Sequence, residues 1–253
     1  MIAPDVTEAI PAATLVLFRE NAGGPPELLI VERGRGLAFA GGALVFPGGR
    51  IDAEDEALAL QLASGDPIGA ARIAALRELI EETGIALGLS PAPDATKIAR
   101  LRAALHAGEP FGALLERHGV TLRLDALVPF ARWRPAHANM RIFDTHFFIA
   151  TAPADATPIA DGTESVRAFW ASAATVLAEA DAGRASLIFP TRRNLERLAR
   201  FASFAEAAAD ARTHPIETIT PWIERRGDAD FLCIPEGLGY PVTAEALDGA
   251  RRA

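Results

Sequence analysis

The segment Ala70 to Ile85, AARIAALRELIEETGI, has the periodicity of an amphipathic helix. At about 100° per residue, Glu78, Glu81 and Glu82 fall within an arc of roughly 100°. The opposite side of the helix is apolar and consists of Ile73, Leu76, Leu79 and Ile80. The segment therefore predicts a helix that packs through one face and presents three carboxylates on its other, exposed face.

Residues at both ends of this segment predict where the helix begins and ends. Asp66 followed by Pro67 suits a cap and a first helical position, and Gly84 suits a left-handed stop. The loop ahead of the helix contains the pair Gly48-Gly49, which lets the backbone approach a ligand closely. We therefore treat this loop and the helix as one candidate site.

Three carboxylates on one helical turn repel one another, so they need either solvent or a cation. Hard divalent ions such as Mg²⁺ take oxygen ligands and commonly bind a few carboxylates together with substrate phosphates. The alternative is a solvated acidic face, which is the more common case for such a triplet considered alone.

The surrounding residues favour the metal site through a resemblance to a known family. Arg77 to Ile85 resembles the second half of the Nudix box, REUxEExGU with U aliphatic, and Phe46-Pro47-Gly48-Gly49 resembles its usual lead-in. Three longer passages resemble the coenzyme A and acyl-coenzyme A diphosphatase branch of this family, which includes a member with an interrupted box. These passages are LLIVERGRGLAFAGGALVFPGGRID, ARWRPAHANMRIFDTHFF and FPTRRNLERLARFAS.

The box of this chain is interrupted between its first acidic residue and its arginine. Asp55 matches the acidic position, but Arg77 comes about a dozen residues later than the family pattern places it. The extra residues, 56–69, are mostly helix formers and predict an inserted helical turn. Asp52, Glu54 and Asp55 all remain candidates for the carboxylate that orients the arginine.

The resemblance implies an α/β fold, a Nudix-type α/β/α sandwich with a mixed sheet. We expect 1–253 to form a single domain with a core at about 10–182. Helical insertions are expected at 56–69, within the box, and at 94–118, and a C-terminal helical extension at about 183–253.

Alternation and turn composition predict the individual elements. Strands are expected at 12–18, 27–33, 44–46, 126–133, 142–150 and 165–170. Helices are expected at 94–107, 110–118, 173–182 and 191–202, with another beginning at the capping-box residue Ser203.

The resemblance also implies the chemistry, in which water cleaves a diphosphate with Mg²⁺, or Mn²⁺ instead, neutralising the phosphate oxygens. Glu78 and Glu82 are the implied metal ligands, and Glu81 is a third ligand with a catalytic role. The Gly48 carbonyl is a candidate backbone ligand. Arg77 is expected to orient the acidic cluster.

Outside the box, Glu164 is the candidate for a base or a further metal ligand, with a plain surface acid as the alternative. Substrate contacts are expected from Arg33, Arg134, Arg141, Gly48 and Gly49. Arg134 and Arg141 belong to a local basic cluster with Arg132 and His137, and arginine forks suit phosphate groups. Exposed loop charge is the alternative for this cluster.

The expected substrate is a small-molecule nucleoside diphosphate linked to another group, with coenzyme A or acyl-coenzyme A as the first hypothesis. ADP-ribose or a dinucleotide is the alternative substrate, and a non-catalytic ligand-binding module is the alternative class. The sequence lacks a GxSxG elbow, a phosphate-binding P-loop and a GxGxxG fingerprint, which excludes the corresponding hydrolase and nucleotide sites.

Composition limits the partners. A formal net charge of -8 argues against a general nucleic-acid or anionic-membrane surface. The single cysteine, Cys233, excludes an intramolecular disulfide framework. Neither a signal peptide nor an apolar run of spanning length is evident, so we expect a cytoplasmic protein, and a homodimer is left open.

Overall fold

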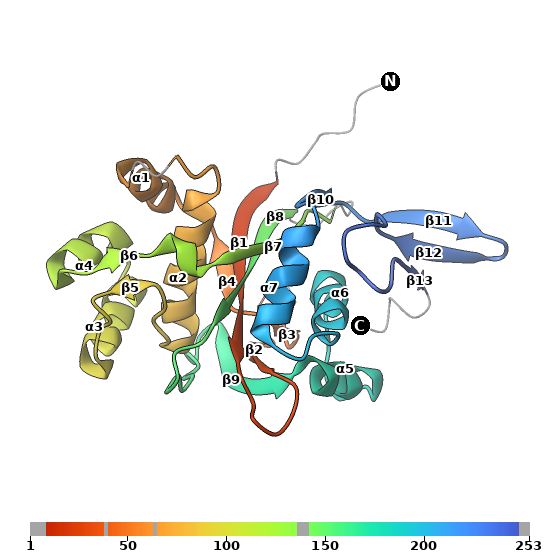
Figure 1. Cartoon of the computed structure of the whole chain (residues 1–253), viewed down its shortest axis with the longest axis horizontal. Coiled ribbons are helices and arrows are strands. Elements are labelled where there is room, and N and C mark those ends of the chain that lie inside the picture. Colours follow the sequence, from red (N-terminus) through yellow and green to blue (C-terminus); the bar gives the residue numbers. More distant parts are fainter. Residues whose placement is uncertain (1–8, 38–39, 63–64, 136–141, 248–253) are drawn as a thin grey trace.

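The computed structural model describes residues 9–37, 40–62, 65–135 and 142–247. A mixed sheet runs through the centre of the molecule, with α2 on one side and α5, α6 and α7 on the other (Figure 1). A small sheet of β11, β12 and β13 projects from one end. The expected α/β/α sandwich is therefore confirmed.

The strands differ in length, and the longest of them lie in the central sheet. They are β1 Ile10–Arg19, β2 Glu27–Arg33, β3 Leu44–Val45, β4 Gly48–Arg50, β5 Leu89–Ser90, β6 Thr121–Leu122, β7 Val128–Trp133, β8 Phe143–Thr151, β9 Ser165–Ser172, β10 Thr218–Ile219, β11 Trp222–Arg226, β12 Ala229–Cys233 and β13 Ala244–Ala246. The helices are α1 Ala53–Gln61, α2 Gly69–Thr83, α3 Ala95–His106, α4 Phe111–His118, α5 Ala173–Asp181, α6 Phe189–Leu198 and α7 Phe204–Thr213, and Leu124–Ala126 forms a 3₁₀ turn.

Strand β1 is the axis of the central sheet. It pairs in parallel with β8 from Ile10 to Phe18, and β8 continues through antiparallel β7 to β10. On its other edge β1 pairs with two strands, with β4 near its start and with β2 at its end. Strand β2 carries β9 along its far edge, and β3 pairs with the end of β2 on the same edge as β1. This fork places the short β4 inside the sheet, beside α2.

Side chains alternate along β1 because successive residues of a strand point to opposite faces. Ala13, Leu15 and Leu17 pack on the side of α2, whereas Val16 and Phe18 pack on the side of α5, α6 and α7. Two apolar cores therefore lie on the two faces of one sheet.

Helix α2 is packed on two sides. Its residues Leu76 and Leu79 pack against the sheet, and Ile73 and Ile80 pack against α3 and α4. The helix begins at Gly69 rather than at Asp66-Pro67, because the Asp66 carboxylate accepts the N–H of Ile68 and forms a turn before the helix. Its predicted end is confirmed, since Gly84 adopts a left-handed φ of 68°.

The expected insertion at 94–118 is helical, whereas the expected box insertion at 56–69 is helical only up to Gln61. In the box, α1 begins at Ala53, before the inserted residues, and its contacts are with α2 and α4. The second insertion forms α3 and α4, whose apolar residues join α2 in a third core. Both insertions therefore lie on the same outer side of the box helix.

The C-terminal extension is helical only in part, so this prediction was wrong beyond α7. Strand β10 joins the central sheet through β7, and β11, β12 and β13 form an antiparallel sheet of their own. Gly227, with φ 59°, and Asp228 connect β11 to β12. This two-residue loop is a hairpin signal that overrides the helical tendency of the preceding sequence.

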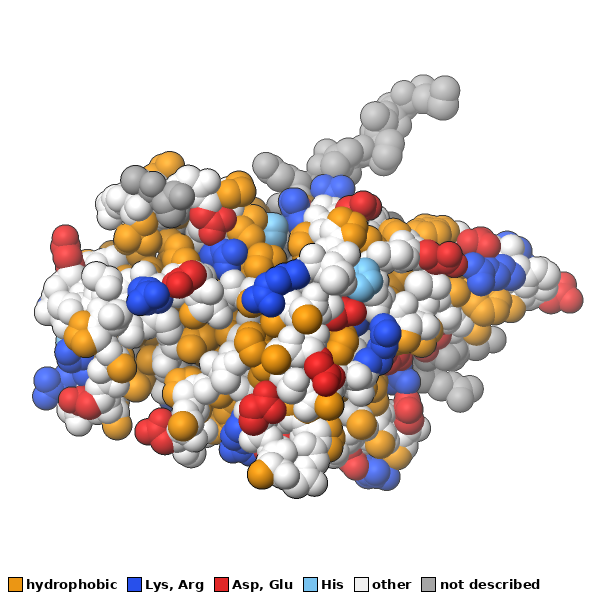
Figure 2. Space-filling model, viewed as in Figure 1, with side chains coloured by type: hydrophobic (Ala, Val, Ile, Leu, Met, Phe, Trp, Pro, Cys, Tyr) orange, Lys and Arg blue, Asp and Glu red, His pale blue; other side chains and the backbone are white. Residues whose placement is uncertain are grey.

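The surface agrees with the charge pattern of the sequence. On the described part of the face in Figure 2, basic and acidic side chains are interspersed, and they do not gather into one basic patch. Among the described residues, no helix combines the length and the apolar character that crossing a membrane requires.

Candidate active site

The paired glycines lie in β4, and each one is needed for a different close approach. A Cβ on Gly48 would lie 2.3 Å from the Ala13 carbonyl oxygen and 2.7 Å from Thr14 Cα, so β4 and β1 could not pair as they do. A Cβ on Gly49 would lie 2.3 Å from Glu78 Oε1. The glycines therefore bring the backbone of β4 against both the central strand and the acidic face of α2.

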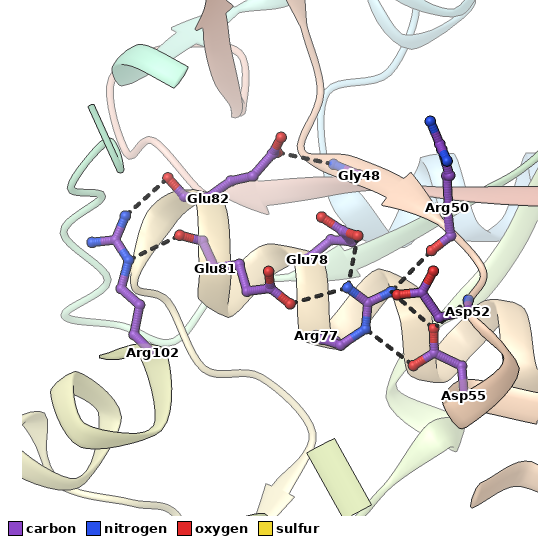
Figure 3. Close-up of polar contacts among 9 residues, drawn as sticks. All are labelled: Gly48, Arg50, Asp52, Asp55, Arg77, Glu78, Glu81, Glu82 and Arg102. Atoms are coloured by element: carbon purple, nitrogen blue, oxygen red, sulfur yellow. Dashed lines mark hydrogen bonds and ion pairs between the residues drawn. The ribbon is translucent and has the colours of Figure 1, made fainter. Parts of the chain in front are cut away.

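Arg77 is the hub of the polar contacts in this site (Figure 3). Its Nε and Nη2 donate to the two oxygens of Asp55 at 3.1 and 2.8 Å. Nη1 donates to Glu78 Oε1 at 2.7 Å and to Glu81 Oε1 at 3.0 Å, and Nη2 also donates to the Arg50 carbonyl at 2.9 Å. The guanidinium thus joins α1, α2 and the end of β4.

Of the three candidate acids, Asp55 is the one that holds the arginine. It is 2% exposed, and its two oxygens accept from Nε and Nη2 along one edge of the guanidinium, a bidentate geometry that is strong for such a pair. The Asp52 carboxylate lies 3.5 Å from Arg77 with its side chain 60% exposed, and Glu54 has no contact with Arg77 among the described residues. The interruption therefore leaves the first box acid at its family position in the sequence.

Glu82 is buried and Glu78 is half-buried beside β4, which corrects the expectation of an exposed acidic face. Glu82 is only 4% exposed, and its Oε2 accepts the Gly48 N–H at 3.1 Å. The reason is that β4 crosses this side of α2, and the helical pattern alone does not reveal that strand. These two carboxylates therefore share a confined space.

Burial and mutual repulsion shift the protonation of both groups. Desolvation raises the pKa of Glu78 to about 7, with repulsion from Glu81 and Glu164 acting in the same direction and Arg77 opposing it. Desolvation, followed by repulsion from Glu78, raises the pKa of Glu82 well above its usual value, and Glu164 adds to the effect. Glu78, Glu82 and Glu164 are therefore close enough to act on one another electrostatically.

Glu164 itself is exposed and lies at the end of the loop before β9. Asp161 Oδ1 accepts the N–H groups of Thr163, Glu164 and Ser165 at 2.6, 2.9 and 3.0 Å. The Glu164 carbonyl accepts the N–H of Gly34 at 2.8 Å. This fixes the backbone that carries the carboxylate, next to the end of β2.

Arg33, at the end of β2, lies close enough to Glu82 to act on its carboxylate electrostatically. Its charge lowers the pKa of Glu82, opposing the larger effect of burial. Within the described part of the chain, no hydrogen bond engages its guanidinium, and its Nε is buried without a partner. Donors are therefore available beside Glu82.

The carboxylates do not converge on one point in the described residues, where no group of three or more His, Cys, Asp or Glu side chains is arranged to hold a metal ion. Glu81 is engaged by Arg77 at 3.0 Å, and Glu78 shares that guanidinium. The role of Glu81 as a third metal ligand therefore stays a prediction. The role of the Gly48 carbonyl as a ligand also stays a prediction, since Gly48 contacts Glu82 through its N–H.

The predicted basic cluster is only partly described. Arg141 and His137 lie outside the described residues. Arg132 pairs with Asp144 through two contacts of 2.7 and 2.8 Å. Arg134 is exposed, and its backbone N–H donates to the Ile219 carbonyl. The structure thus shows no contact between Arg134 and the carboxylates of α2.

Arg102, in α3, is a residue of this region that the sequence did not reveal. Its guanidinium donates to the carbonyl oxygens of Glu81 and Glu82, at the C-terminal end of α2 (Figure 3). No local motif surrounds it, because its partners are backbone atoms far along the chain.

The fold that carries this site is similar to that of a solved structure. A crystal structure of a Nudix hydrolase from Alicyclobacillus acidocaldarius matches with a TM-score of 0.72 and 28% identity, covering 81% of this chain and 97% of that chain. The chain has the Nudix hydrolase fold. No protein-family model and no curated protein matches it.

Other structures with the Nudix fold match less well. A MutT/nudix family protein from Enterococcus faecalis gives a TM-score of 0.41 at 12% identity, covering 93% of this chain and 52% of that chain. The Nudix domain of Shewanella oneidensis NrtR, solved with ADP ribose, gives 0.45 at 16% identity, covering 78% and 91%. Both scores are too low to support an inference about this chain.

Proposed function

We propose that the chain is a metal-dependent hydrolase that cleaves the diphosphate linkage of a nucleoside diphosphate joined to another group, with coenzyme A or an acyl-coenzyme A as substrate. The observation that carries the proposal is the pair of carboxylates of half-buried Glu78 and buried Glu82, held against the glycine strand β4. Two confined carboxylates are costly unless a cation neutralises them.

The chemistry of these donors fits a divalent metal ion, and the carboxylates would have to move together to hold one. Glu82 receives one backbone N–H, Glu78 shares Arg77 with two other acids, and Glu164 adds a third negative charge nearby. Carboxylate oxygens with few competing donors are the ligands that Mg²⁺ and Mn²⁺ take. Glu78 and Glu82 would hold the ion with Glu164, and Glu81 would join them on leaving Arg77.

When bound, the metal would supply charge neutralisation at the phosphate oxygens and a lower pKa for the attacking water. The chain supplies the positioning. Arg77, fixed by Asp55 and the Arg50 carbonyl, holds Glu78 and Glu81 on the correct side of α2. Arg33 offers unpaired donors for a phosphate, and Glu164 is the proposed base or further ligand.

The coenzyme A assignment is supported by the three passages that resemble that branch, which lie around the box, in β7 to β8 and in α6. ADP-ribose and dinucleotides contain the same linkage and are the alternative substrates. A ligand-binding module without hydrolysis is the alternative class, and the complete set of Asp55, Arg77 and acidic residues argues against it.

The test is to incubate the purified protein with Mg²⁺ and a panel of coenzyme A, acetyl-coenzyme A, ADP-ribose, NADH and diadenosine polyphosphates. We expect cleavage of the coenzyme A compounds, which the Glu82→Gln variant abolishes. Turnover of another panel member would keep the chemistry and refute the branch. Absence of turnover with both Mg²⁺ and Mn²⁺ would refute the hydrolase assignment and favour the binding module.

A further inference from the structure

Arg102 connects three backbone segments through one guanidinium. Its Nε donates to the Glu81 carbonyl at 2.9 Å, and its Nη2 donates to the Glu82 carbonyl at 3.2 Å and to the Ile159 carbonyl at 2.8 Å. Glu81 and Glu82 belong to the last turn of α2, whereas Ile159 belongs to the loop between β8 and β9. The insertion helix α3 thus ties the end of the box helix to this loop.

The same loop leads directly to Glu164. The Ile159 N–H donates to the Thr83 carbonyl at 2.8 Å, so both polar groups of that peptide are held at the end of α2. Two residues further on, Asp161 is near enough to Arg102 to attract its charge, and Asp161 also accepts the N–H of Glu164. A continuous chain of contacts therefore runs from Arg102 to the backbone of Glu164.

We propose that Arg102 is a positioning residue that holds the loop of Glu164 in register with Glu81 and Glu82, so that carboxylates from two distant segments act on one cation. This rests on the proposed function, because it takes Glu164 to be part of the metal shell. The second insertion, which carries Arg102 in α3, acquires a role in the site through this contact.

The alternative is that Arg102 only caps α2, since a cation near a helix C-terminus is stabilising in itself. The two roles differ in what geometry they need. A lysine keeps the charge at the helix end but lacks the planar fork that reaches several carbonyls at once. Arg102→Lys therefore preserves the capping charge and breaks the connection to Ile159.

The chain offers matched controls for this variant. Arg100 is an exposed arginine of the same helix and has no hydrogen bond or ion pair within the described residues, so Arg100→Lys reports the substitution alone. The Ile159 side chain is 63% exposed, and its two contacts are made by the backbone. Ile159→Ala should therefore leave the loop in place.

The first measurement is amide hydrogen exchange of the metal-free protein. We expect Arg102→Lys to speed exchange at Ile159, Thr163 and Glu164 by about tenfold, because these amides are protected by contacts that local opening breaks. Arg100→Lys and Ile159→Ala should leave these amides unchanged. Unchanged exchange at all of them in Arg102→Lys would overturn the proposal.

The second measurement is a double-mutant cycle on Mn²⁺ binding. Calorimetry measures the Mn²⁺ affinity of Arg102→Lys, of Glu164→Gln and of the combined variant. If Arg102 acts through Glu164, each single change and the combination should all weaken binding by about tenfold. A hundredfold loss in the combined variant, about the product of two independent effects, would show that Arg102 does not act through Glu164.

Hydrogen exchange and Mn²⁺ binding together also distinguish a failure of this inference from a failure of the proposed function. If the unmodified protein binds no Mn²⁺, the hydrolase assignment fails, and hydrogen exchange alone decides whether Arg102 holds the loop. Thermal unfolding of all variants checks that Arg102→Lys remains folded under the conditions of both measurements.

Discussion

Gly49→Ala should separate metal binding from folding, because the three atoms nearest to the added methyl group all belong to the Glu78 carboxylate. The new Cβ would lie 2.3 Å from Oε1, 2.4 Å from Cδ and 2.7 Å from Oε2 of Glu78. Non-bonded contacts need about 3.5 Å. The carboxylate must therefore move by about 1 Å, away from β4.

This displacement predicts the size of the effect. A misplacement of about 1 Å in a site costs about a hundredfold in rate. The cost in stability is limited, since the moved group is the end of a side chain and its loss is one contact with Arg77, worth about 1–3 kcal/mol as a charge-assisted hydrogen bond.

Gly48→Ala is the matched control, with the same methyl group one residue earlier. Its Cβ would meet the Ala13 carbonyl oxygen at 2.3 Å and Thr14 Cα at 2.7 Å, which are backbone atoms of the central strand. These atoms cannot yield as a side chain can, so we expect a loss of about 3 kcal/mol or more.

The assay combines turnover of the panel substrate, calorimetric Mn²⁺ binding and urea unfolding for both variants. Gly49→Ala should lose metal affinity and remain folded, whereas Gly48→Ala should lose stability. Equal losses of stability in the two variants, or unchanged Mn²⁺ affinity in Gly49→Ala, would refute the assignment of Gly49 to the approach between β4 and Glu78.

Two further predictions concern the buried charges. Asp55→Asn should reduce the free energy of unfolding by about 3 kcal/mol, because it leaves Arg77 buried without its main partner. The control, Asp52→Asn, keeps an equally good helix cap and should reduce it by less than about 1 kcal/mol. Urea titrations measure both values. In the metal-free protein, the pKa of Glu78 is raised from 4.5 to about 7, so the folded state binds more protons and stability should fall as pH rises between these values, by about 3 kcal/mol in all. Urea titrations across this range test the slope, which Glu78→Gln should reduce without removing it, because the pKa of Glu82 is also raised; a rise in stability with pH that disappears in that variant would contradict the sign.

The sequence predicts the box helix well because the packing of α2 depends on its own periodicity. Ile73, Leu76, Leu79 and Ile80 are all buried, as expected from their side of the helix. The burial of Glu82 could not be predicted in the same way, since it depends on β4 crossing that side through pairing with β1. A helical pattern gives the faces of a helix but not the elements that cover them.

The identity of the acid that holds Arg77 was likewise open until the fold was known. Asp52, Glu54 and Asp55 are close in sequence, and only the docking of α1 on α2 decides between them. Arg102 could not be found because its partners are carbonyl groups, which every residue has. By contrast, the β11 to β12 hairpin had a local signal in Gly227-Asp228 that the helical interpretation of the C-terminal part overlooked.

The pairing of Asp55 with Arg77 brings the two halves of the Nudix motif into contact, although extra residues separate them in the sequence. The contact fixes where α1 starts and where the first turns of α2 lie, and it sets no length for the chain that joins them. Lengthening a connection costs little, about 0.6 kcal/mol for each doubling. The connection between α1 and α2 can therefore accept inserted residues without loss of the Asp55–Arg77 contact. A sequence pattern that requires a fixed number of residues between the two halves of the motif depends on the segment whose length is least constrained.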